Sequence, residues 1–163
     1  MILANNKSSH DLQLRDLKLI MNIFEKMNRL EYDFAWANQI TDELMVHQPF
    51  LASMMAGYKF DLPPQEMDEV LKLYVAVWEF FKTDPMAKVT AITESQFDRL
   101  HTFNVNLMAK NDSVDGGTIS VLLSVIIQRF GTRPTFQQMN VQKLGALIVG
   151  IRSTIECFQE LVM

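Results

Sequence analysis

The sequence predicts an all-α fold, a single-domain bundle of six or seven helices. Apolar residues recur at helical spacing through every long segment, and the five prolines lie at the junctions between segments. No segment shows the sustained alternation of apolar and polar residues that is typical of strands. A chain of 163 residues, 48% of them hydrophobic, is long enough for one core. We therefore expect residues 1–163 to form one domain, with residues 1–9 as a mobile tail.

Three helices are expected in the first part of the chain. The first covers residues 11–31, where the apolar side chains share one broad face and Ser9 can cap the first turn. The second covers residues 33–47. Pro49 can then occupy the first turn of a third helix over residues 49–59, because its missing N–H is not needed there.

The middle of the chain carries the clearest helix, over residues 64–82. Its apolar residues form a continuous stripe, and the opposite side predicts a solvated back face that contains Asp68, Lys72 and Glu79. A short helix is expected over residues 86–91. Thr93 and Gln96 then stand at the spacing of a capping box, which predicts a long helix over residues 94–110.

The C-terminal part contains the most apolar segment. Residues 118–129 are apolar nearly all round and carry no charge before Arg129, so we expect this helix to be central in the bundle. The last helix, over residues 141–161, has a core stripe and a second stripe of small side chains. That second stripe consists of Ala146, Gly150, Ser153 and Cys157. Small side chains let a neighbouring helix approach closely, either within the fold or across a homodimer interface.

Composition excludes several classes of protein. The formal net charge is −4, which argues against nucleic acid as a partner, since nucleic-acid binding requires a basic surface. One cysteine cannot form an internal disulfide framework. No apolar stretch approaches the length of about 20 residues that spans a bilayer. We expect a cytoplasmic protein with no membrane contact.

A metal site is a weak alternative for the helix over residues 94–110. Asp98 and His101 stand three residues apart, the spacing that helical bundles use for a carboxylate and a histidine ligand. Such sites need further carboxylates from facing helices, and the sequence offers few. We therefore interpret His101 as a boundary residue beside an acidic edge and expect no metal and no cofactor.

Four residues are candidates for contact with a ligand or an anion. Arg129 and Arg133 flank a turn, so both could reach one anion, although acidic residues of the N-terminal helices could equally pair with them. Asp16 projects into an apolar helix face, where a carboxylate needs a partner. His47 ends the second helix on its apolar side and could donate to the last carbonyls or contact a ligand.

No nucleophile elbow, phosphate-binding loop or dinucleotide fingerprint occurs in the sequence. We therefore favour a non-enzymatic interaction or regulatory protein that self-associates through the last helix or binds another protein. The second hypothesis is a small-molecule-binding module with an apolar pocket lined by Met and Phe, because the chain holds 11 of each. In that case Asp16, His47 or His101 would supply the polar contact. A metal-dependent enzyme that uses Asp98 and His101 is a third alternative.

Overall fold

The computed structural model describes residues 2–109 and 121–162. For residues 2–13, 16, 30–31 and 121 it describes the backbone and not the side chain. Over these ranges the chain is helical and contains no strand, so the all-α prediction is confirmed. Nine α-helices and two 3₁₀-helices lie in this part of the chain, more than the six or seven predicted. Two of the α-helices have only four residues each: the one over residues 86–89 agrees with the short helix expected there, and the one over residues 134–137 forms where no helix is expected. The elements are α1 Ile2–Met27, η1 Asn28–Glu31, α2 Phe34–His47, α3 Pro49–Gly57, η2 Tyr58–Phe60, α4 Pro64–Phe81, α5 Met86–Val89, α6 Glu94–Ala109, α7 Val121–Thr132, α8 Pro134–Gln137 and α9 Val141–Val162.

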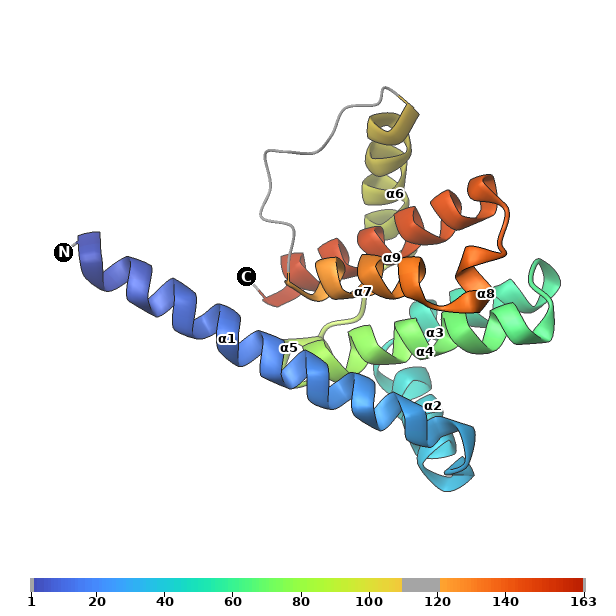
Figure 1. Ribbon diagram of the computed structural model, residues 1–163, viewed down its shortest axis with the longest axis horizontal. Coiled ribbons are helices and arrows are strands. Elements are labelled where there is room, and N and C mark those ends of the chain that lie inside the picture. The colour runs from blue at the N-terminus through green and yellow to red at the C-terminus, as the bar shows by residue number, and fades with distance from the viewer. Residues whose placement is uncertain (1, 110–120, 163) are drawn as a thin grey trace.

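The first helix is longer than the sequence predicts. It begins at Ile2, so residues 2–9, which the sequence analysis expects to form a tail, are helical, and its first turns extend beyond the other helices (Figure 1). Its second half packs on the bundle through the buried side chains of Ile20, Ile23 and Met27. These three residues recur at helical spacing, so they lie on the apolar face that the sequence predicts.

The central helix of the bundle is α4, not the segment over residues 118–129. Figure 1 shows α4 between α1 and α9, and Tyr74 and Trp78 are completely buried. The expected solvated back face is wrong for two of its three members, because Lys72 and Glu79 are also buried. Lys72 pairs with Asp68 at 3.0 Å, and Glu79 pairs with Lys82 at 2.6 Å. Charged residues opposite an apolar stripe thus did not indicate exposure, since each has a partner.

The described part of the 118–129 segment belongs to α7, which is amphipathic. Leu122, Ile126 and Phe130 face the core, whereas Ile127 is 42% exposed. An aliphatic helix therefore covers one side of the bundle here. In the described part of α7, the exposed residues before Arg129 are Ser124, Ile127 and Gln128, none of them charged, and this lack of charge explains why the sequence pattern suggested a central position.

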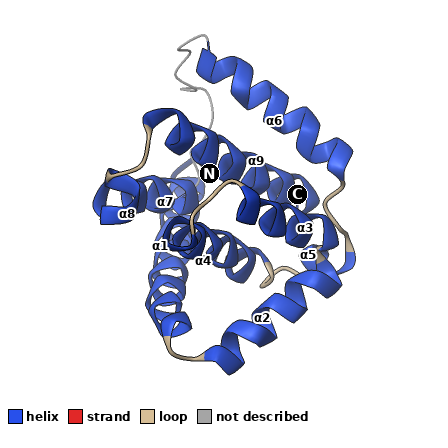
Figure 2. Ribbon diagram, turned by 90° about the vertical axis from the view of Figure 1, so that its right-hand side faces the viewer, coloured by secondary structure: helices blue, strands red, loops and turns tan. Residues whose placement is uncertain are grey.

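A sharp corner joins α2 to α3 (Figure 2). Gln48 has a non-helical backbone (φ −134°, ψ 68°) and Pro49 has no N–H to continue α2, so a new helix starts at Pro49. The Gln48 side chain is completely buried. It donates to the carbonyls of Ala87 (2.7 Å) and Thr90 (3.0 Å) and accepts from the N–H of Ile92 (2.8 Å). These three bonds attach the corner to α5 and to the segment that follows it.

The small-residue stripe of α9 lies mainly inside the chain. Ser153 and Cys157 are completely buried and Gly150 is also buried, whereas Ala146 is exposed. A Cβ on Gly150 would lie 3.1 Å from the hydroxyl oxygens of both Tyr58 and Tyr74. Close approach therefore occurs within the fold. Self-association of the protein stays a prediction, and these three stripe positions are already covered by the chain's own side chains.

Candidate functional site

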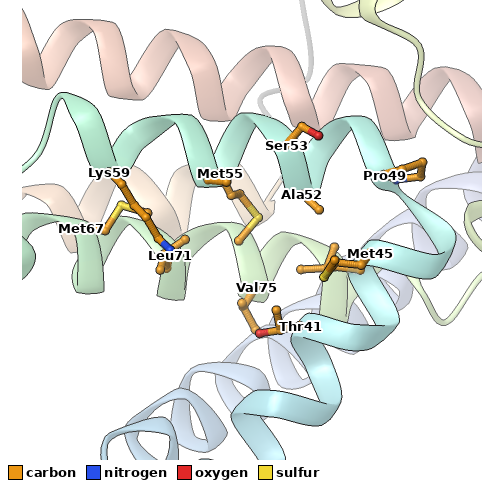
Figure 3. A pocket seen from close by; sticks show the side chains of 12 residues that line it. Thr41, Met45, Pro49, Ala52, Ser53, Met55, Lys59, Met67, Leu71 and Val75 are labelled. Atoms are coloured by element: carbon orange, nitrogen blue, oxygen red, sulfur yellow. The ribbon is translucent and has the colours of Figure 1, made fainter.

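A cleft of about 510 Å³ lies between α2, α3 and α4 (Figure 3). Its walls are mainly apolar, and three of the lining side chains are methionines. The lining residues are Thr41, Leu44, Met45, Pro49, Ala52, Ser53, Met55, Ala56, Lys59, Met67, Leu71 and Val75. The volume lies within the usual range for small-molecule pockets, roughly 300–1,000 Å³.

The floor of the cleft is one face of α4. Met67, Leu71 and Val75 follow one another at intervals of four residues, so they form a row along the helix. Eight residues of helix extend over about 12 Å. The cleft is therefore elongated, and Figure 3 shows Lys59 and Met67 toward one end and Pro49 and Met45 toward the other.

The opposite walls are set by the α2–α3 corner. Ala52 and Ala56 lie one helical turn apart on α3, and their small side chains leave space that larger ones would fill. Met45 is 59% exposed at the rim. Because the Gln48 side chain attaches the corner to the segment after α5, α2 and α3 are held in place without packing tightly on this face of α4.

A tyrosine pair closes the bundle beside one end of the cleft. The hydroxyl groups of Tyr58 and Tyr74 are 2.8 Å apart and their rings are in contact, which attaches η2 to α4. Burial raises the pKa of Tyr58 and raises the pKa of Tyr74 well above its ordinary value. Both hydroxyls therefore stay protonated and hydrogen-bonded, and this pair positions the backbone of Lys59.

Arg129 and Arg133 both lie next to one anionic group, which is the carboxylate of Glu69 in the same chain. The buried carboxylate of Glu69 accepts from the Arg133 guanidinium at both oxygens and lies 3.8 Å from Arg129. The Arg129 guanidinium also stacks over the ring of Phe24, with 5.1 Å to its centroid. These contacts link α7 to α4 and α1, and neither arginine lines the cleft.

His47 also has a partner in the fold. Its ring stacks on Trp78 with centroids 6.0 Å apart, and its Nδ1–H donates to the carbonyl of Lys88 at 3.0 Å. The last carbonyls of α2, the partners expected from the sequence, are not what this nitrogen contacts. His47 is not among the residues that line the cleft.

Asp98 and His101 are not part of a metal cluster in the described residues. Asp98 is exposed, and the His101 ring stacks on Phe97 with 5.3 Å between centroids. Within residues 2–109 and 121–162, no three His, Cys, Asp or Glu side chains gather as metal ligands would. Asp16 lies on α1, but its side chain falls outside the described set, so its partner stays a prediction.

The cleft was only partly visible in the sequence. The many methionines and phenylalanines of the chain suggested a pocket. Met45, Met55 and Met67 do line the cleft, but no phenylalanine is among the lining residues. Lys59 was missed. The available signal is that Lys59 is the first charged residue after an uncharged run over residues 48–58. Periodicity assigns residues to inner faces, but it does not show where two inner faces stay apart.

Comparison of the chain with protein-family models, with curated proteins and with solved structures finds no match. Over the residues that the structure describes, no helix combines the length and the apolar character that crossing a bilayer demands.

Proposed function

We propose that the chain is a non-enzymatic binding protein that holds an apolar ligand in the α2–α3–α4 cleft. The observation that carries this proposal is the elongated cavity of about 510 Å³ whose floor and walls are methionine, leucine, valine and alanine side chains. Apolar walls favour a ligand that loses contact with water on binding. Methionine side chains are flexible and adapt to ligands of irregular shape.

The polar groups near the cleft support binding more than catalysis. Thr41 and Ser53 line it as hydroxyls, but the Thr41 hydroxyl already donates to the Ala37 carbonyl at 2.9 Å. The lining contains no histidine, cysteine or carboxylate. The two hydroxyls can orient a ligand. Lys59 is the one ionisable side chain in the lining, so the lining offers no second ionisable group to form an acid–base pair with it.

Titration with the neutral dye Nile red tests the proposal. Wild-type protein should bind the dye with saturable fluorescence at one site. Ala52→Trp should reduce the affinity at least about tenfold, because the indole occupies the cleft. Ala146→Trp places the same side chain at an exposed position of α9 and should bind like wild type.

Thermal unfolding of each variant must accompany this titration. If Ala52→Trp does not unfold cooperatively, Ser53→Trp at the exposed rim replaces it. Equal dye affinity in wild type and in a folded cleft-filling variant would show that the cleft is not the binding site.

A protein partner, or a second copy of the chain, is the second candidate. It is favoured by the exposed apolar side chains of Phe34, Met45 and Val46, all on α2, the helix that forms one wall of the cleft. Sedimentation of wild type and Met45→Glu over a range of concentrations tests self-association. A wild-type monomer at high micromolar concentration would exclude the homodimer, whereas a dimer weakened by Met45→Glu would assign its interface to α2.

A further inference from the structure

Lys59 is the single charged residue in the lining of the cleft. It lies in η2, directly after α3, and Figure 3 shows its side chain reaching the end of the cleft where Met67 and Leu71 lie. A positive charge at one end of an elongated apolar cavity is an asymmetric feature. It matches a ligand that has an apolar chain and a negative group at one terminus.

The ammonium group of Lys59 has no ion-pair partner among the described residues. By contrast, Lys72, Lys82 and Lys143 each form a salt bridge with a carboxylate at 2.6–3.4 Å. Lys59 is exposed, so its side chain can keep the charge in water while its methylene groups cover Met67 and Leu71. Its backbone position is nevertheless held, because the neighbouring Tyr58 is hydrogen-bonded to Tyr74.

We propose that the ligand of the cleft is a linear aliphatic carboxylate, a fatty-acid-like molecule whose head group pairs with Lys59 and whose chain lies along Met67, Leu71 and Val75. This inference rests on the proposed function, because it names the ligand class of the same site. One lysine matches one negative charge. The row along α4 is about two turns long, which suits an extended chain better than a bulky ring system.

Competition with bound Nile red by decanoate and decanol separates the contribution of the head group from that of the chain. Wild-type protein should prefer decanoate by about three- to tenfold, the range expected for a partly exposed charge-assisted hydrogen bond. Dodecanoate should bind about fourfold more tightly than decanoate for each added methylene that the cleft buries. Added salt should reduce the preference for the carboxylate, since salt screens an exposed ion pair.

Lys59→Met removes the charge and keeps an unbranched apolar side chain. This variant should lose the preference for decanoate and should bind decanol at least as well as wild type. Lys26→Met, which removes an exposed lysine on α1 distant in sequence from the cleft, is the matched control and should keep the preference. If Lys59→Met does not unfold cooperatively, Lys59→Gln takes its place.

The possible failures are distinguishable. If decanoate and decanol compete equally in wild type, or if a folded Lys59 variant keeps the preference, the head-group inference is wrong while the apolar cleft remains a binding site. If Nile red, decanoate and decanol all fail to bind wild-type protein, the proposed function itself is wrong. A Lys59 role limited to the dipole at the end of α3 would lower the thermal midpoint without changing the carboxylate preference, and this result would also overturn the inference.

Discussion

Two faces of α4 carry similar apolar side chains but have different surroundings. On one face, Leu73 and Val77 are completely buried, and Phe81 stacks on the Phe158 ring of α9 with 4.9 Å between the centroids. On the other, Met67 and Leu71 form the floor of the cleft. The first face is closed by a long helix that packs along it, whereas α2 and α3 leave a cavity over the second.

The difference between the two faces arises from connectivity. The corner at Gln48 points the α2–α3 pair toward the segment after α5, where its side chain makes three hydrogen bonds. After α3, η2 is attached to α4 through Tyr58, whose hydroxyl contacts that of Tyr74. A local polar anchor at each end thus keeps the walls apart. The apolar surface of α4 is therefore core on one side and the floor of a cleft on the other.

The largest effect is expected when a charge enters the closed side of the bundle. Ile126 on α7 is completely buried. In Ile126→Asp an unpaired carboxylate would cost several kcal/mol, against a total stability of about 5–15 kcal/mol. We expect unfolded or insoluble protein by circular dichroism and solubility. Ile127→Asp, at the neighbouring exposed position, should fold. A cooperatively folded Ile126→Asp variant would contradict the packing described for α7.

The close contact at Gly150 should give the next largest effect. Gly150→Leu forces its Cβ against two tyrosine hydroxyls, of which that of Tyr74 is completely buried, and we expect a loss of at least about 3 kcal/mol by urea denaturation. Gly131→Leu is the control, since nothing lies within 4 Å of a Cβ there. The oligomeric state should not change. A shift in sedimentation without a loss of stability would instead indicate an interface between chains.

Truncation on the two faces of α4 compares them directly. Leu73 is completely buried in the core, so Leu73→Ala should cost about 3 kcal/mol through lost burial and a new cavity. Leu71 borders space that is already open, so Leu71→Ala should cost about 1 kcal/mol. Chemical denaturation of both variants measures the difference. Equal costs would mean that the Leu71 face is packed as tightly as the core.

The closed face was largely predictable from sequence, and the open face was not. The stripe over residues 64–82 predicted the α4 helix and its buried residues, because apolar periodicity reports which side chains leave water. The pairs Glu69–Arg133 and Glu43–Lys82 join residues from different parts of the chain, so their proximity depends on tertiary packing. Likewise, nothing in the sequence distinguishes Gln48 from other polar residues. Its three hydrogen-bond partners are backbone groups 39–44 residues further along the chain, and their proximity follows only from the fold.

The Gln48 anchor should have an intermediate effect on stability and a specific effect on the cleft. Gln48→Leu leaves two carbonyls and one N–H without this partner, and we expect a loss of about 2 kcal/mol. Gln39→Leu, at an exposed position of α2, is the matched control and should be nearly neutral. If the corner holds the cleft open, Gln48→Leu should also weaken Nile red binding. Unchanged binding would show that the cleft walls do not depend on this anchor.

The smallest effect is expected from mild oxidation of Cys157. Its side chain is completely buried on the closed side, and burial raises the pKa of the thiol to about 12. The reactive thiolate is therefore scarce at neutral pH and has no access to reagent, so we expect no cross-linked dimer on a non-reducing gel. Formation of a disulfide-linked dimer before unfolding would place Cys157 at an interface between chains and would support a homodimer that forms through α9.

The raised thiol pKa also predicts a pH dependence of stability. Below about pH 9, the ordinary value for the group, the thiol is protonated in both the folded and the unfolded chain. Between about 9 and about 12 the unfolded chain releases the proton while the folded chain retains it, so the free energy of unfolding falls as pH rises, by at most about 1.4 kcal/mol per pH unit. Other groups titrate in the same range, and Cys157→Ala isolates the thiol because it retains all of them. The stability of wild type relative to Cys157→Ala, measured by urea denaturation, should be constant from pH 6 to about pH 8 and should decrease above about pH 9. A constant difference up to about pH 11 would mean that the thiol ionises as readily in the folded chain as in the unfolded chain, which tight packing against the closed side of the bundle does not allow.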